Sequence, residues 1–159
     1  MPLSNLNLAS VSTFSGNYAN VATSLSFSAL NASVFTSEGK EVVLGTGASD
    51  SMPNQSTSIS RTTGIILHFN EVLDVSTFAI GSGNEIQLST ASGFGSGHIS
   101  SASITRTGEF GTQLYVAVTS ALAAGTRYYL RVVHGVGGTN EGGKALAATV
   151  YFNSFTTVS

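Results

Sequence analysis

Between residues 51 and 157, short stretches of alternating apolar and polar residues are separated by glycine-rich segments. The stretch 113–118, for example, places Leu114, Val116 and Val118 on one side of an extended chain. A period of two residues is typical of a β-strand with one buried face. We therefore predict an all-β protein with about seven strands in a sandwich or barrel. The predicted strands are 57–60, 65–69, 85–88, 102–105, 113–118, 128–132 and 149–157, the last with a bulge at 153–154.

The first 45 residues alternate in shorter stretches, and no charged residue occurs before Glu38. We interpret residues 1–45 as an extended arm that carries short strands, residues 46–52 as a linker, and residues 53–159 as the sandwich. Such an arm could add strands to a neighbour's sheet, or it could pack on its own chain as an extra hairpin. The first option predicts an assembly interface formed by the arm's apolar residues, which are Leu6, Leu8, Val11, Phe14, Tyr18, Val21, Leu25, Phe27, Leu30 and Phe35.

The composition supports a folded chain with an unusual surface. Hydrophobic residues make up 42% of the sequence, which is enough for a core. Charged residues make up only 9%, against roughly 25% in an ordinary soluble domain. A surface built from Ser, Thr, Asn and Gly repels its neighbours weakly. Either other subunits cover much of this surface, or the chain is an ordinary Ser/Thr-rich β protein.

Charge and cysteine content exclude several functions. The formal net charge is −2, and the six Lys and Arg residues are scattered, so we expect no nucleic-acid partner. The chain has no cysteine, which rules out disulfides and thiolate metal sites. The sequence starts without a basic region followed by a continuous apolar stretch, so we expect no secretory signal peptide. No apolar run approaches the roughly 18 residues of a membrane span.

Three segments match short sequence motifs of a known family, and they occur in the same order as in that family. Residues 67–78 read Leu-His-Phe-Asn-Glu-Val-Leu-Asp-Val-Ser-Thr-Phe, residues 122–132 read Leu-Ala-Ala-Gly-Thr-Arg-Tyr-Tyr-Leu-Arg-Val, and residues 155–157 read Phe-Thr-Thr. Together they resemble the bacterial immunoglobulin-like (Ig-like) domains of S-layer and surface proteins, a type that is also found on phage virions. The resemblance covers about residues 51–157.

This resemblance implies an Ig-like β-sandwich of about seven strands. Tyr128 matches the corner tyrosine of such folds, whose hydroxyl bonds upstream backbone. The family's Asp-x-x-Gly-Asn motif before the last strand is not matched, because residues 135–144 contain no Asp. An ion-binding or anchoring role of that Asp therefore does not carry over. The fold-defining residues implied are Phe69, Val72, Phe78, Leu122, Gly125, Tyr128, Leu130, Val132 and Phe155.

Motifs for catalysis or cofactor binding are weak. Residues 138–145 nearly match a phosphate-binding loop, but Ala145 stands where a hydroxyl should hold magnesium, and no helix is predicted to follow. His68, His98 and His134 have no metal-ligand spacing. We predict a non-enzymatic protein without cofactor or metal.

Two further groups of side chains leave alternatives open. Glu71 and Asp74 could bind calcium weakly or lie in a solvated turn, and calcium needs six or more oxygen ligands. Exposed tyrosines at 115, 129 and 151 could bind sugars or form ordinary cross-strand packing.

Two functions follow from these observations. The first is a structural virion protein, either a phage capsid decoration (cement) protein or a tail protein. It would self-associate, with a trimer as one option, and bind other subunits such as a major capsid protein. It would contact neither nucleic acid nor membrane. The second is an Ig-like module of a bacterial surface, S-layer or adhesin protein, with glycan binding as an option. This second function needs an export route.

Overall fold

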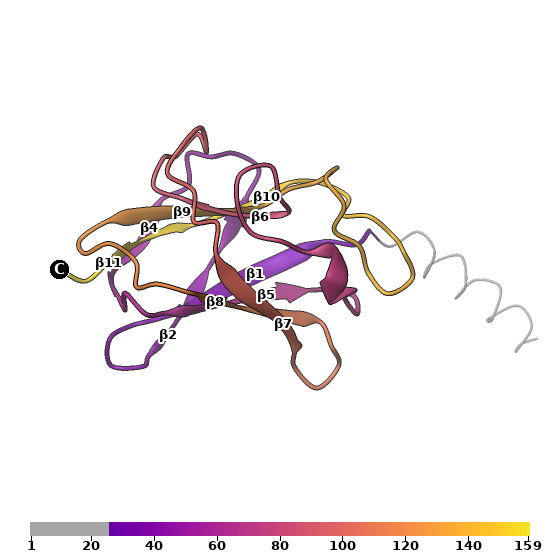
Figure 1. Ribbon diagram of the computed structural model, residues 1–159, viewed down its shortest axis with the longest axis horizontal. Helices are drawn as coiled ribbons and strands as arrows, with labels where there is room; N and C mark the ends of the chain where they lie inside the picture. Colours follow the sequence, from indigo (N-terminus) through magenta and orange to yellow (C-terminus); the bar gives the residue numbers. More distant parts are fainter. Residues whose placement is uncertain (1–25) are drawn as a thin grey trace, which may run out of the picture.

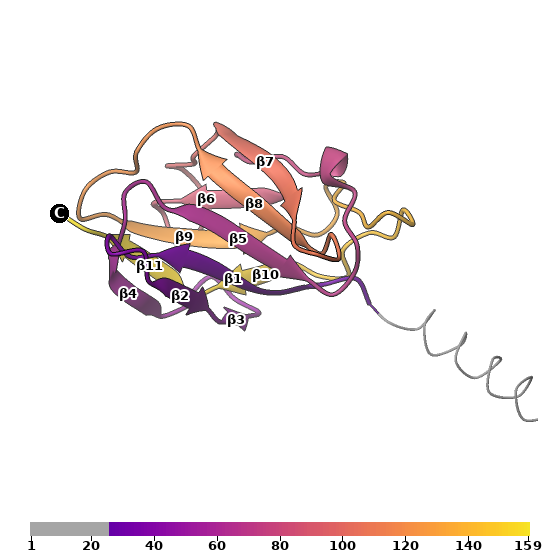
Figure 2. The ribbon, with the colours of Figure 1, turned by 90° about the horizontal axis from the view of Figure 1, so that it is seen from below.

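Two β-sheets pack face to face in the computed structural model, which describes residues 26–159. The described residues form eleven strands and one short 3-10 helix, η1 (Val75–Thr77). Figure 2 shows the two layers with their strands running roughly along the long axis of the molecule. An all-β sandwich was expected, and the two-sheet all-β architecture is confirmed.

The first sheet contains five strands in the order β2-β1-β5-β8-β7, and every neighbouring pair is antiparallel. Its edges are therefore β2 and β7. The strands are β1 (Ala29–Phe35), β2 (Glu41–Leu44), β5 (Gly64–Phe69), β7 (Ala102–Thr107) and β8 (Gln113–Val118).

The second sheet is built around β9 (Arg127–Val132). On one side β9 pairs with β6 (Ile86–Ser89), and on the other it pairs with β10 (Val150–Phe152) and then β11 (Ser154–Thr157). β3 (Thr46–Gly47) pairs antiparallel with β10, and β4 (Asn54–Ile59) pairs parallel with β11. Between β10 and β11 the chain leaves the ladder at Asn153, whose N–H donates to Gly45 O (2.7 Å). The break lies where the bulge was predicted.

The inward faces of both sheets form one apolar core. Leu114 and Val116 of β8 are fully buried, as the alternation predicted, and Val118 packs partly buried against them. Aromatic rings pack against one another in this core. Phe69 contacts Phe27 and Phe78, with ring centroids 5.7 and 5.5 Å away.

The structure differs from the expected division into arm, linker and sandwich. Residues 29–44 form β1 and β2 in the same sheet as β5, and β3 lies inside the expected linker. Ala32, Val34 and Leu44 are completely buried in the common core. Of the two options for the arm, its described part therefore packs on its own chain. The pattern alone could not decide this, because alternation shows that a strand needs cover but not which chain supplies it.

Replacing Leu44 in β2 by Ala tests whether this region is part of the sandwich. Because Leu44 is completely buried, we expect L44A to lower the free energy of unfolding by about 2–5 kcal/mol. The neighbouring Val43 is 51% exposed, so V43A should change it by less than about 0.5 kcal/mol. Denaturant titration of both variants measures the difference, and equal effects would contradict the packing of β2 described above.

Candidate functional site

Loop side chains gather at the end of the sandwich opposite the C-terminus, where Figure 1 shows the β5–β6 and β9–β10 loops together. Glu71 accepts hydrogen bonds from Asn140 Nδ2 and from Lys144 Nζ, the latter at 3.1 Å. The backbone N–H of Lys144 donates to Asn140 Oδ1 at 2.7 Å. Glu71 therefore holds the β9–β10 loop, and Asn140 supplies a polar anchor in the segment that lacks the family's Asp.

Asp74, unlike Glu71, caps the start of η1. Its Oδ1 accepts hydrogen bonds from the backbone N–H (3.1 Å) and the hydroxyl (2.6 Å) of Ser76 at the start of η1. Its own N–H donates to Thr139 O at 3.1 Å. Within residues 26–159, no three His, Asp or Glu side chains come together as metal ligands. Of the two options for this acidic pair, the contacts favour a turn over a calcium site, because both carboxylates bond groups of their own chain.

The near match to a phosphate-binding loop forms a tight hairpin. Thr139 and Ala145 pair in an antiparallel bridge, and Asn140 N–H donates to Lys144 O at 3.0 Å. The ammonium group of Lys144 lies against the Glu71 carboxylate. A phosphate cradle needs backbone N–H groups aimed at the ligand from a helix start, and this hairpin is not followed by a helix.

The outer face of the first sheet brings a serine, a histidine and a glutamate together. Ser33 Oγ donates to Glu41 Oε1 at 2.6 Å and lies 3.4 Å from His68 Nε2. In a catalytic triad the acid orients the histidine, whereas here it binds the serine. Ser33 is also 1% exposed, so a substrate could not reach it. No sequence pattern predicts this group, because it arises from the pairing of β2, β1 and β5.

The other two histidines bind backbone carbonyls in separate places. His134 Nδ1 lies 2.6 Å from Leu146 O, and His98 Nε2 lies 2.9 Å from Phe94 O. A ring nitrogen that bonds a carbonyl must carry a proton, so in the neutral imidazole Nδ1 of His98 is an acceptor. This buried atom has no hydrogen-bond partner among the described residues. Through these bonds to backbone carbonyls, His98 and His134 each stabilise a loop.

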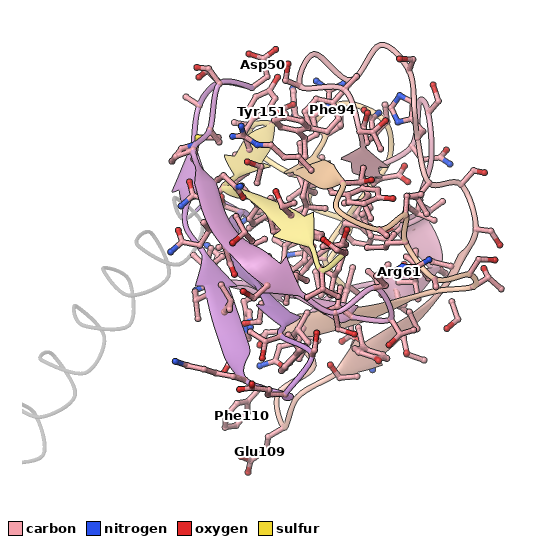
Figure 3. All side chains as sticks on the ribbon, turned by 90° about the vertical axis from the view of Figure 1, so that its left-hand side faces the viewer. Asp50, Arg61, Phe94, Glu109, Phe110 and Tyr151 are labelled. Carbon is pink, nitrogen blue, oxygen red and sulfur yellow. The ribbon has the colours of Figure 1, made fainter. Side chains whose placement is uncertain are left out.

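Arg131 organises a cluster on the outer face of the second sheet. Its Nε and Nη2 donate to Gln87 Oε1 at 2.9 and 2.8 Å, and its Nη1 donates to the Tyr151 hydroxyl at 3.2 Å. The guanidinium lies 4.3 Å from the ring centroid of Phe94, which the 90–98 loop folds onto the sheet. Figure 3 shows Phe94 next to Tyr151. Phe94 has a φ of 54°, the only positive φ at a non-glycine among the described residues.

The tyrosines that could have bound sugars have other contacts. The ring of Tyr151 lies 6.1 Å from Phe94, and that of Tyr129 lies 5.1 Å from the guanidinium of Arg127. Tyr115 lies over Gly64, where any Cβ would overlap its ring, and it is 37% exposed. For Tyr129 and Tyr151 these contacts favour ordinary packing.

Tyr128 forms a corner between β8 and β9. Its hydroxyl accepts a hydrogen bond from Ala123 N–H at 2.9 Å, which confirms the expected bond to upstream backbone. Its ring stacks on Phe155 with centroids 5.9 Å apart. Thr157 Oγ1 donates to Ala123 O at 2.5 Å, so the same short loop is held from two strands. Gly125, at φ 57°, makes the turn into β9.

The residues implied by the family resemblance fall mostly in the core. Val72 is the exception among the apolar ones, at 37% exposed. It lies in the loop after β5, where its backbone carbonyl accepts from Glu141 N–H at 2.9 Å. Those buried in the core are Phe69, Phe78, Leu122, Tyr128, Leu130, Val132 and Phe155.

Three of the predicted interface residues lie in the described part of the chain. Phe27 is completely buried in its own core, which corrects its assignment to an interface, since its ring fills the space beside Phe69. Leu30 is 52% exposed, and Phe35 is half-buried. The residues outside the described part of the chain are Leu6, Leu8, Val11, Phe14, Tyr18, Val21 and Leu25.

The most exposed large apolar side chain among the described residues was not predicted. Phe110 is 75% exposed in the loop between β7 and β8. Figure 3 shows it projecting from the molecule next to Glu109. The available signal was an aromatic residue between Gly108 and Gly111, because such a turn cannot bury a large side chain in its own hairpin.

Removing the Tyr128 hydroxyl tests the corner. We expect Y128F to lower the free energy of unfolding by about 0.5–1.5 kcal/mol, because the hydrogen bond from Ala123 N–H to the Tyr128 hydroxyl is lost. The adjacent Tyr129 points to the opposite face, so Y129F should cost less than about 0.5 kcal/mol. Thermal and denaturant unfolding of both variants provide the comparison, and a harmless Y128F would mean that the hydroxyl bond does not stabilise the corner.

Residues 26–159 contain no helix of a length and hydropathy that would cross a bilayer. No family model matches the chain, and no curated protein or solved structure is significantly similar to it.

Proposed function

We propose that the chain is a structural subunit of a virion, a capsid decoration or tail protein, that displays an Ig-like domain. The observation that carries this proposal is the composition of the N-terminal segment that precedes the sandwich. Among residues 26–159, both sheets bury their inner faces in one apolar core. Residues 1–25 add large apolar side chains and no charge. An uncharged segment rich in large apolar residues is suited to burial against other subunits.

The strand arrangement supports the Ig-like assignment. In a constant-type Ig fold one sheet has the order A-B-E-D and the other C-F-G. Here β1-β5-β8-β7 matches the first order and β6-β9-β10/β11 the second. β4 would be a second half of strand A that pairs parallel with the last strand. β2 and β3 are then an insertion between the two halves of strand A, and the Tyr128 corner lies at the start of strand F.

The proposed mechanism is mechanical. The sandwich acts as a rigid body whose loops are fastened by Glu71, Arg131 and Tyr128. Residues 1–25 bind copies of the same chain and other shell proteins, such as a major capsid protein. The low charge of the surface favours such close packing, because neighbouring subunits repel one another weakly.

Deleting residues 1–25 tests this function. A deletion to residue 45 is unsuitable, because it removes the buried Val34 and Leu44 and should prevent folding. We expect the 26–159 chain to keep the unfolding midpoint of the full chain but to lose self-association and binding to virions. Thermal unfolding measures the midpoint, light scattering measures self-association, and co-sedimentation with isolated virions measures binding to virions.

Two outcomes would contradict the proposal. A truncated chain that still binds virions as the full chain does would show that residues 1–25 are not the attachment segment. A full chain that ignores virions but binds glycans on an array would instead support the alternative, a module of a bacterial surface protein or adhesin.

A further inference from the structure

The outer face of the first sheet is uncovered in the described part of the chain. Figure 2 looks onto this face, and no other described element lies across it. The opposite face of the same sheet belongs to the core, where Leu44, Leu67 and Leu114 are completely buried. Because side chains alternate along a strand, the residues between these point away from the core. The sheet therefore presents a second set of side chains to its surroundings.

An apolar row crosses this outer face from strand to strand. The residues that pair directly opposite one another run from Val43 in β2 through Ser33 and Ile66 to Tyr115 in β8. Such neighbours share a face, with Cβ atoms about 4.5–5.5 Å apart. Val43 is 51% and Tyr115 is 37% exposed, and Ile66 is half-buried. Ser33, the one polar member, is buried and donates its hydroxyl to Glu41, so the row is apolar where it meets solvent.

Further apolar side chains widen this row. Ala117 follows Tyr115 by two residues on β8, and Phe35 follows Ser33 by two residues on β1, so both share its face. Both are half-buried. Leu30, at the bulge near the start of β1, is 52% exposed. Leu30 and Phe35 are also the two residues expected at an interface that the core does not absorb.

Charge hardly interrupts this face. Apart from tyrosine, the five strands of the sheet contain only Glu41, His68 and Arg106 as ionisable residues. Glu41 accepts the Ser33 hydroxyl, and Arg106 bonds the carboxylate of Glu141. A charged partner would lose water here without gaining a counter-charge, whereas an uncharged apolar partner would not. The face therefore suits an uncharged partner.

The size of the face decides between two uncharged occupants from the same protein. Five strands about 4.8 Å apart and about six residues long make a face of roughly 400 Å². A stable contact between two folded subunits buries roughly 800 Å² on each partner. The face is therefore too small to hold a second sandwich by itself. A single extended segment needs only a few residues to cover the apolar row.

Residues 1–25 fit the face in composition, length and point of attachment. They contain large apolar residues and no charge. A chain of 25 residues can reach at most roughly 80–90 Å. The described chain enters the sandwich at the end of the sheet, where Ser26 O accepts from Asn70 Nδ2 (2.6 Å) and Phe27 O accepts from Ala147 N–H (3.0 Å). The segment is thus attached beyond the end of its own sheet and is long enough to reach an adjacent copy.

We propose that the outer face of the first sheet receives residues 1–25 of a neighbouring copy, which pack their apolar side chains on the row formed by Val43, Ile66 and Tyr115. This inference rests on the proposed function, in which residues 1–25 join subunits, and it names the surface that they bind. Each copy gives one segment and receives another. Such a head-to-tail contact forms a closed ring when the rotation between copies permits.

A charge placed on the row tests the receiving surface. We expect V43D to raise the dissociation constant of self-association at least about tenfold, because the packed segment would bury a carboxylate that has no partner. V136D is the matched control, since Val136 is an exposed valine (43%) in the loop after β9, and it should leave the constant unchanged. Sedimentation equilibrium of the full chain measures both variants. Equal constants for V43D and V136D would overturn the inference.

Cross-linking between two single-cysteine chains tests which copy supplies the segment. The chain has no cysteine of its own, so S10C labels the segment and V43C labels the row. We expect a bis-maleimide to join an S10C chain to an isotope-labelled V43C chain, and mass spectrometry identifies the mixed product. V136C in place of V43C should give background cross-linking only. A link that forms within the double variant S10C/V43C but not between the two chains would place the segment on its own sheet and overturn the inference.

The deletion of residues 1–25 separates this inference from the proposed function. If the deletion abolishes self-association while V43D associates like the unmodified chain, the segment joins subunits through another surface, and only the inference fails. If the deletion changes neither self-association nor binding to virions, the proposed function fails and the inference fails with it. Loss of self-association in both the deletion and V43D, with V136D unaffected, supports both.

Discussion

The second sheet depends on β9, because every other strand of that sheet pairs with β9 or with one of its partners. β6 pairs with one side of β9, and β10 and β11 share the other side. The direction in which β9 starts is therefore a constraint on the whole layer. That direction is set by the left-handed turn at Gly125 and by the Tyr128 hydroxyl, which holds the loop before the strand. Thr157, at the end of β11, bonds the same loop, so the start of β9 and the end of β11 are held together at one corner.

Because the molecule has so few charges, its loops are held by neutral groups and by individual charged side chains. Arg131 satisfies three contacts at once, because it bonds Gln87 and Tyr151 and also stacks on Phe94. Glu71 joins two loops through Asn140 and Lys144. In such a protein most charged side chains near the loops have a structural partner. The outer surface is left to hydroxyl, amide and apolar groups, which suit contacts with other proteins.

The sequence predicted what alternation can determine and missed what depends on pairing. Leu114 and Val116 were assigned to the buried face correctly, because a period of two fixes the buried face of a strand. Alternation does not specify a partner, so β1 and β2 were assigned to a separate arm although they belong to the main sheet. The Arg131 cluster could not be predicted, since it requires the register of β6 against β9 and a left-handed Phe94. The Tyr128 bond was predictable because its motif fixes both partners within a few residues.

The first and last parts of the described chain are interleaved. Phe27 O accepts a hydrogen bond from Ala147 N–H, and β4 pairs with β11, the final strand. Contacts between residues so distant in sequence close large loops and slow the folding of β proteins. During synthesis, which proceeds from the N-terminus, β4 waits for its partner until residue 157 has left the ribosome. The second sheet is therefore completed only after translation of this domain has ended, and until then its unpaired strands are exposed to neighbouring nascent chains.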